Sequence, residues 1–121
     1  MELRVDGKVA MVTGADSGIG RGIAERMAES GADVMVCYYS DRTGAEQTAA
    51  ACRAFGRRAE IAQGDVGDPD AARAMFEQHD AAFGRIDILV NNAGIGDGEH
   101  IVDQPFEDFE RVIRTNLYGP W

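Results

Sequence analysis

Two patterns of apolar residues alternate along the chain. Short, nearly continuous apolar runs are typical of strands that are buried on both faces of a parallel sheet. Between these runs, apolar residues recur every three or four positions, as they do along one face of a helix. The runs predict strands at Lys8–Thr13, Asp33–Tyr39, Arg58–Ala62 and Ile86–Val90. The other stretches predict helices from Ile19 to about Ser30, from Asp41–Thr43 to about Phe55, from Asp68 to just before Gly84, and from Pro105 through Leu117.

The helical spacing also predicts which side chains each helix turns toward the sheet. Asp68 followed by Pro69 is a strong helix start, because the acid caps free N–H groups and proline is preorganised for the first helical position. The predicted inward residues are Ile19, Ile23, Ala24, Met27 and Ala28 in the first helix, Ala45, Ala49, Cys52 and Phe55 in the second, Ala72, Met75, Phe76 and Phe83 in the third, and Phe106, Phe109, Val112, Ile113 and Leu117 in the last.

The alternation of strand and helix predicts an α/β fold with a parallel sheet and helices on both faces. Right-handed crossovers then give a doubly wound (Rossmann) arrangement with strand order 3-2-1-4. In such a sheet ligands bind beyond the carboxyl ends of the strands, at the point where the strand order reverses. Thr13–Gly20 leaves the first strand there and Asn91–Gly94 leaves the fourth, so we expect these two segments to meet at one site.

A turn with three glycines follows the first strand and opens the first helix. Gly14, Gly18 and Gly20 allow a sharp turn and a close approach to a ligand. The helix that follows directs its free N–H groups and the positive end of its dipole at the same place, which suits a pyrophosphate. The spacing Gly-x-x-x-Gly-x-Gly differs from the commoner Gly-x-Gly-x-x-Gly, and three glycines alone also fit a purely structural turn.

Length, charge and cysteine content narrow the class of protein. A chain of 121 residues has room for one domain, taken as residues 1–121, with a substantial core. The net charge of −9 argues against nucleic acids and anionic membranes as partners. No apolar run approaches the ~20 residues of a membrane span, and the N-terminus lacks the apolar region of a secretory signal. Cys37 and Cys52 fall on predicted buried positions, which favours free thiols over a disulfide. Free thiols in turn favour a cytoplasmic location, where the environment is reducing.

Four motifs occur in order along the chain: Thr13-Gly14-x-x-x-Gly18-Ile19-Gly20, Asp65-Val66, Asn91-Asn92-Ala93-Gly94 and Asn116-Leu117-x-Gly119. With these motifs the whole chain resembles the short-chain dehydrogenase/reductase family, and within it is similar to 3-oxoacyl-carrier-protein reductases and glucose dehydrogenases. The resemblance implies an NAD(P)-dependent oxidoreductase that transfers a hydride between the nicotinamide cofactor and a small alcohol or ketone.

The resemblance also implies roles for individual residues. Those expected to hold the pyrophosphate and nearby ribose are Gly14, Ser17, Gly18, Ile19 and Gly20; those at the adenine are Asp65 and Val66; those along the path to the nicotinamide ribose are Asn92, Ala93 and Gly94. Asn116 would hold a water in a proton relay. Three of these assignments have a purely structural alternative. Asp65 could be an ordinary loop residue, Asn91–Gly94 a turn, and Asn116 a polar residue on a helix. We expect Thr13 to be structural, its hydroxyl joining the exits of the first and fourth strands.

The end of the second strand bears on the choice between NAD and NADP. An acid there binds the ribose 2′-OH of NAD, whereas a nearby arginine accommodates the 2′-phosphate of NADP. Tyr38 stands in the acid's place, Tyr39 and Ser40 could bind a phosphate, and Arg42 could reach it. Ser17 argues the other way, because many NADP-binding relatives carry a basic residue at that position. We favour NADP over NAD. The alternative is that Arg42 is an ordinary solvated side chain at the start of a helix.

The residues that complete the family's chemistry are absent from this sequence. That chemistry uses a serine, and a tyrosine with a lysine four residues later, whose charge lowers the tyrosine pKa. The only lysine is Lys8, and none of the tyrosines, Tyr38, Tyr39 and Tyr118, has a lysine four positions on. His79 and His100 have neither a nucleophile partner nor metal-ligand spacing, so we expect no metal site.

We therefore expect an N-terminal portion of such an enzyme, truncated before a fifth strand and inactive alone. The alternatives are a non-catalytic dinucleotide-binding module and an interaction protein that reuses the fold, since fold alone does not fix function. Without a fifth strand, Ile86–Val90 would form an open sheet edge. Such edges pair with other chains, so we expect the chain alone to be marginally stable or to self-associate through this strand or the last helix.

Overall fold

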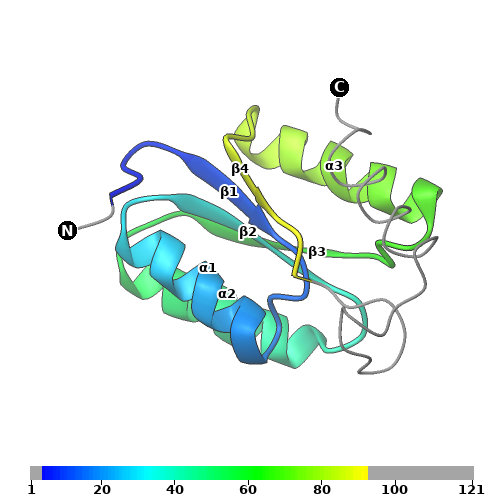
Figure 1. Cartoon of the computed structure of the whole chain (residues 1–121), viewed down its shortest axis with the longest axis horizontal. Coiled ribbons are helices and arrows are strands. Elements are labelled where there is room, and N and C mark those ends of the chain that lie inside the picture. The colour runs from blue at the N-terminus through cyan, green and yellow to red at the C-terminus, as the bar shows by residue number, and fades with distance from the viewer. Residues whose placement is uncertain (1–3, 93–121) are drawn as a thin grey trace.

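The computed structural model of the chain describes residues 4–92, in which strands and helices alternate (Figure 1). The strands are β1 (Val9–Val12), β2 (Asp33–Tyr38), β3 (Ala59–Gln63) and β4 (Ile88–Val90), and the helices are α1 (Gly18–Glu29), α2 (Arg42–Ala54) and α3 (Pro69–Phe83). Each of these elements was predicted from the apolar pattern, with ends that differ by at most two residues. The helix predicted from Pro105 lies outside the described residues.

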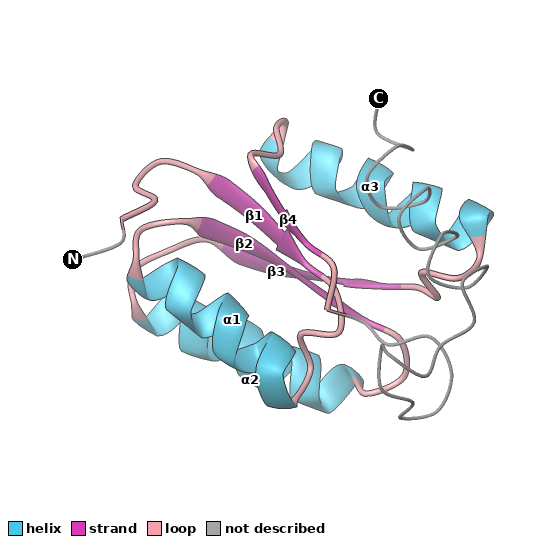
Figure 2. Cartoon of the chain, viewed as in Figure 1, coloured by secondary structure: helices cyan, strands magenta, loops and turns pink. Residues whose placement is uncertain are grey.

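The strands form one parallel sheet in the order β3-β2-β1-β4. Helices α1 and α2 cover one face of the sheet and α3 covers the other, which Figure 2 shows in profile. The predicted doubly wound Rossmann fold with strand order 3-2-1-4 is therefore confirmed. Because β1 lies between β2 and β4, the strand order reverses at the β1–β4 pair, as the sequence predicted.

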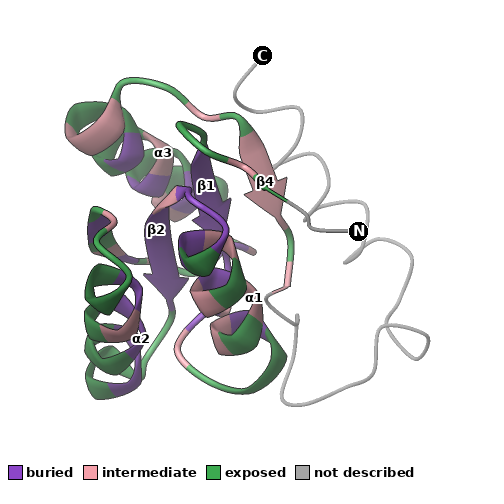
Figure 3. Cartoon of the chain, turned by 90° about the vertical axis from the view of Figure 1, so that its left-hand side faces the viewer, coloured by how far each residue is buried: buried purple, intermediate pink, exposed green. Residues whose placement is uncertain are grey.

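The core has one apolar layer on each face of the sheet. The layer under α1 and α2 is built largely of alanine and valine, including Ala24, Ala28, Ala45 and Ala49. These small side chains allow the helices to pack close to the strands. The layer under α3 contains larger groups, among them Met11, Met35 and Met75. All four residues of β1 are buried, whereas those of β4 are only half-buried (Figure 3).

Two residues predicted to face the sheet do not. Ile19 is 77% exposed and Phe55 is 49% exposed. In the first turn of α1 it is Gly20 that packs inward, so Ile19, about 100° around the helix from it, points outward. Phe55 is the C-cap of α2, where the backbone has already left the helical conformation that the spacing assumes.

Acidic caps begin two of the helices, as the sequence indicated for one of them. The Asp68 carboxylate accepts a hydrogen bond from the backbone N–H of Asp70, and Pro69 occupies the first helical position. At the start of α2 the Asp41 carboxylate accepts from the N–H of Gly44 at 2.9 Å. Such a cap satisfies an N–H group that has no partner within the helix.

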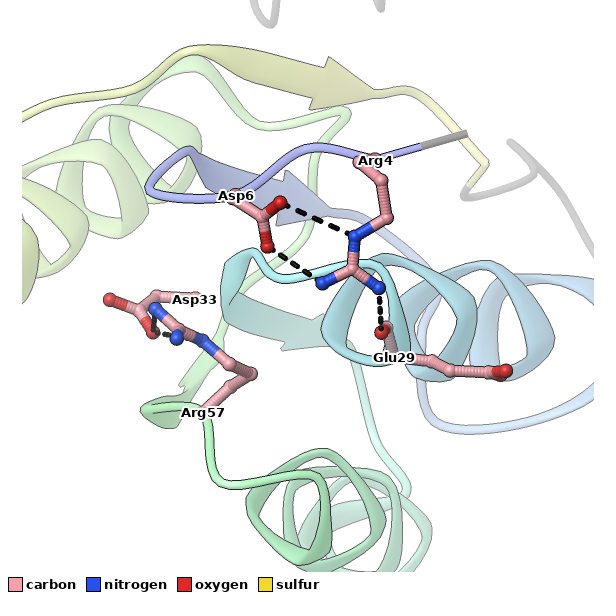
Figure 4. Close-up of polar contacts among 5 residues, drawn as sticks. All are labelled: Arg4, Asp6, Glu29, Asp33 and Arg57. Atoms are coloured by element: carbon pink, nitrogen blue, oxygen red, sulfur yellow. Dashed lines mark hydrogen bonds and ion pairs between the residues drawn. The ribbon is translucent and has the colours of Figure 1, made fainter. Parts of the chain in front are cut away.

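Polar contacts fasten the segment before β1 to the amino end of the sheet (Figure 4). The Arg4 guanidinium forms an ion pair with Asp6 at 2.7 Å and donates to the Glu29 carbonyl oxygen near the end of α1. Beside them, Arg57 pairs with Asp33 at the start of β2, at 3.0 Å. This end of the molecule is opposite the strand exits where a ligand is expected, so these contacts stabilise the fold away from the candidate site.

Both cysteines are buried free thiols, as predicted. Burial raises the pKa of Cys37 to about 12 and that of Cys52 to about 11, so both remain protonated at neutral pH. They act as small apolar core residues.

In residues 4–92 no helix is both long and apolar enough to cross a membrane.

Candidate functional site

The turn between β1 and α1 adopts the sharp geometry that its glycines predicted. Gly14 and Gly18 have φ angles of +61° and +56°, in the left-handed region that side chains other than glycine rarely adopt. The turn delivers the chain directly into α1, whose N-cap is Ser17. The Ser17 side chain makes no capping hydrogen bond, and the first turn of α1 carries no acidic residue.

The start of α1 therefore differs from the starts of α2 and α3, which are capped by Asp41 and Asp68. The first N–H groups of a helix carry a partial positive charge and need an acceptor from outside the helix. At α1 the described side chains do not supply a capping acceptor, and the glycines keep the approach open. This arrangement suits an anionic ligand group at the turn.

The exits of β1 and β4 meet at this turn, as the topology predicted. The backbone N–H of Asn92 donates to the Thr13 hydroxyl at 3.0 Å, and the Asn92 side-chain amide donates to the Gly14 carbonyl at 3.2 Å. The Thr13 backbone N–H in turn donates to the Val90 carbonyl at 3.1 Å. Thr13 thus joins the two strand exits, in agreement with the structural role expected for it.

At Gly20, α1 packs closely against the two strand exits. A Cβ atom at this position would overlap the Gly14 carbonyl oxygen and the Asn92 side-chain nitrogen. Any side chain here would push the first turn of α1 away from the Gly14 carbonyl. The third glycine of the motif is therefore required by packing, whereas the first two are required by the backbone conformation.

Helix α2 and strand β2 hold the turn from the other side. The hydroxyl of Thr48, fully buried on α2, donates to the Ala15 carbonyl at 2.8 Å and also lies 3.1 Å from the Gly44 carbonyl. The Ala15 N–H donates to the Cys37 carbonyl of β2 at 3.0 Å. Sequence reasoning overlooked Thr48; the available signal was a polar residue at helical spacing among the inward-facing alanines of α2.

The end of β2 carries the residues considered for cofactor choice. Tyr38, the last residue of β2, is buried against the core under α2, whereas Tyr39 is 64% exposed. Arg42 begins α2, and its Nε lies 2.9 Å from the Glu46 carboxylate one turn later. The hydrogen bond to Glu46, together with the nearby Tyr38, raises the pKa of Arg42. The structure thus places a cation at the carboxyl end of β2, next to an exposed tyrosine.

The loop after β3 forms a turn around Asp65. The Asp65 carboxylate accepts a hydrogen bond from the Gly67 N–H at 2.8 Å, and its backbone carbonyl accepts from the Asp68 N–H at 3.0 Å. Val66 is buried, while Asp65 is exposed. The turn gives Asp65 a local structural role, and its contact with an adenine stays a prediction.

Three predicted site residues, Ala93, Gly94 and Asn116, lie outside the described residues, as does His100.

His79 is described and is a core residue of α3. Its Nε2 lies 2.7 Å from the Arg85 carbonyl oxygen and its ring packs 5.2 Å from the Phe83 ring. Burial lowers the pKa of His79. It lies where α3 leads into β4, away from the strand exits. Across residues 4–92, no three His, Cys, Asp or Glu side chains gather closely enough to hold a metal ion.

Comparisons with known proteins agree with this geometry. A family model described as short chain dehydrogenase matches residues 8–121. Versicolorin reductase stcU of Emericella nidulans is 43% identical over 116 residues, which are 96% of this chain and 44% of that protein. L-rhamnose 1-dehydrogenase (NAD(P)(+)) of a Sphingomonas species is 38% identical over 97% of this chain and 46% of that protein.

Solved structures give the same result. The crystal structure of a short chain dehydrogenase from Burkholderia cenocepacia in complex with NADP has a TM-score of 0.75 and 40% sequence identity, over 96% of this chain and 47% of that chain. The chain thus spans about half the length of the relatives that it matches.

Proposed function

Since the chain belongs to the short-chain dehydrogenase/reductase family, we propose that it is the dinucleotide-binding portion of an NAD(P)-dependent oxidoreductase. The proposed reaction is hydride transfer between the nicotinamide ring and a small alcohol or ketone. The observation that carries the proposal is the junction of the glycine turn with Asn92, where two segments that are distant in sequence are hydrogen-bonded beside the uncapped start of α1. The Burkholderia cenocepacia relative, solved with NADP, supports a nicotinamide cofactor for this chain.

In this proposal the pyrophosphate lies at the uncapped N-terminus of α1. Backbone N–H groups of the turn, at Gly14 and Ser17 through Gly20, would bind its oxygens in place of charged side chains. The exposed side chain of Ile19 would contact the cofactor, which accounts for a large apolar group at the surface beside the turn. The adenine would lie by Asp65 and Val66, and the nicotinamide ribose by Asn92, Ala93 and Gly94. When bound, the nicotinamide supplies the hydride acceptor or donor.

We propose NADP(H) as the preferred cofactor. The acid that would bind the 2′-OH of NAD is replaced by Tyr38, and Arg42 lies at the same strand end. Tyr39 is exposed next to this position and would contribute a hydroxyl to the same phosphate.

We also propose that residues 1–121 do not complete the reaction by themselves. Asn116 would hold a water in the proton relay, but the sequence has no tyrosine with a lysine four residues later to supply the general acid. Loss of general acid–base catalysis costs on the order of 10²–10⁴ in rate.

Binding and turnover are tested separately. Titrating the purified chain with NADPH and NADH, followed by nicotinamide fluorescence, is expected to give saturable binding with tighter NADPH. Mixing the chain with NADPH and a panel of ketones is expected to show no loss of NADPH absorbance. Absence of binding would contradict the dinucleotide site and favour an interaction protein, whereas turnover would contradict the proposed inactivity.

Self-association is part of the proposal. Within residues 4–92, β4 pairs with β1 along one edge and no strand pairs with its other edge, while its three residues remain half-buried. Unpaired, partly apolar strand edges favour association with another chain. We expect the chain alone to sediment as a dimer or larger species; a monomer that unfolds cooperatively would contradict this.

A further inference from the structure

Arg42, which is proposed to recognise a 2′-phosphate, forms an ion pair with an acidic residue of the same helix. The Arg42 Nε lies 2.9 Å from a carboxylate oxygen of Glu46, which stands one helical turn later on α2. Both side chains are exposed, at 71% and 56%. Arg42 is therefore anchored on its own helix, close to the end of β2.

A carboxylate also binds a backbone N–H group at the start of α2. The Gly44 N–H, which could otherwise donate to an anion, is capped by the Asp41 carboxylate at 2.9 Å. The two carboxylates therefore occupy the Arg42 Nε and the Gly44 N–H, two of the donors that a 2′-phosphate would use. A phosphate approaching Arg42 would have to displace Glu46 or share the guanidinium with it, and it would feel the repulsion of a negative charge at close range.

We propose that Glu46 is a specificity-determining residue, which restrains the preference of this chain for cofactors with a 2′-phosphate by competing for Arg42. The inference rests on the dinucleotide site proposed above and adds to it a residue that opposes Arg42. An exposed ion pair of this spacing is weak. The restraint is accordingly partial: the phosphate still binds, but less tightly than an uncontested arginine would allow.

The direct test is Glu46→Gln. Glutamine keeps the length and polarity of the side chain at an exposed helical position, so the fold is expected to be retained. NADPH binding, measured by fluorescence at low ionic strength, is expected to tighten by about threefold to tenfold. NADH binding is expected to change by less than about twofold, since NADH carries no phosphate at that position.

Glu29→Gln is the matched control. Glu29 forms a similar exposed pair with Arg26 on α1, at 3.2 Å, near the opposite end of the molecule. It changes the net charge by the same amount, so any general effect of charge on nucleotide affinity appears equally in both variants. The ratio of NADPH to NADH affinity is expected to stay at the wild-type value in Glu29→Gln.

Arg42→Gln completes the test. In that background Glu46→Gln is expected to have no effect on the ratio, because the group for which Glu46 competes is gone. A ratio that does not change in Glu46→Gln, or that changes equally with and without Arg42, would overturn the role of Glu46 and leave the dinucleotide site standing. If the wild-type chain binds neither NADPH nor NADH, the proposed function itself fails and the role of Glu46 falls with it.

Discussion

The side-chain amide of Asn92 donates a hydrogen bond to the carbonyl oxygen of Gly14 at 3.2 Å, although the two residues are 78 positions apart in the chain. This contact joins the exit of β4 to the turn after β1 at the point where the strand order reverses. A carbonyl only accepts hydrogen bonds, so the contact requires a donor at position 92. Asparagine supplies that donor and leaves its side-chain oxygen for another partner.

Asn92→Asp tests this contact. The replacement has nearly the same shape, but it presents a carboxylate oxygen to the Gly14 carbonyl, so attraction becomes repulsion. We expect a loss of about 1–3 kcal/mol in the free energy of unfolding, measured by urea denaturation, together with weaker NADPH binding. The neighbouring exposed residue provides the control, since Asn91→Asp adds the same charge. Equal stabilities of the two variants would show that the Gly14 contact contributes little.

Gly20→Ala tests the close approach of α1 to the strand exits. The added methyl group would overlap the Gly14 oxygen and the Asn92 side chain, so the helix start must shift. Overpacking of this kind costs about 1–3 kcal/mol, and displacement of the turn is expected to weaken NADPH binding. Thermal unfolding and fluorescence titration measure the two effects.

Gly22→Ala is the matched control in the same helix. Nothing lies within 4 Å of a Cβ atom at Gly22. Alanine is the better helix former, so this variant is expected to gain about 0.5–1 kcal/mol in stability and to bind NADPH as the wild type does. If both variants change stability in the same direction, the explanation by local overlap is wrong.

The fold could be predicted almost completely from the apolar pattern. The run Val9–Val12 is buried on both faces, and a strand in that position leaves a continuous apolar signal whatever its neighbours are. Right-handed crossovers and the strand–helix alternation then restrict the strand order to few possibilities. The meeting of Thr13 with Asn92 followed from this order, because the carboxyl ends of parallel neighbours lie at the same edge.

Side-chain environments were less predictable. Helical spacing identifies a face of α1 but not the turn at which the packed surface begins, and this is why Ile19 was wrongly placed inside. The spacing also ignores hydrogen bonds between elements, which give Thr48 its position on Ala15 and His79 its position on Arg85. Both residues are polar, yet they occupy inward positions where their polar atoms meet backbone carbonyls.

Thr48→Val tests the support that α2 gives to the turn. Valine keeps the shape of threonine but removes the hydroxyl, leaving the buried Ala15 carbonyl without this donor. We expect a loss of about 1–3 kcal/mol in unfolding free energy and several-fold weaker NADPH binding. Thr48→Ser retains the hydroxyl and is expected to bind NADPH nearly as the wild type does. If the serine variant lost as much affinity as the valine variant, the methyl group and not the hydroxyl would be responsible.

The pH dependence of stability tests the buried imidazole of His79. The Arg85 carbonyl accepts a hydrogen bond from Nε2, so Nε2 carries the proton of the neutral ring. Nδ1 is buried, and within residues 4–92 it has no hydrogen-bond partner. Protonation of Nδ1 would therefore place an unpaired charge in the core. This burial lowers the pKa of His79 below its ordinary value of 6.5.

Because the folded-state pKa is the lower one, the unfolded chain binds more protons at mildly acid pH. Stability is expected to change little around pH 7 and to fall as pH drops from 6.5 toward the folded-state pKa of His79. The acids with lowered pKa, Asp6 and Asp87, affect stability only near and below pH 3.8, a separate range. His79→Gln, which retains an N–H donor but does not titrate, is expected to flatten urea-derived stability between pH 7 and 5. Parallel pH profiles for the wild type and His79→Gln would mean that another group controls stability in this range.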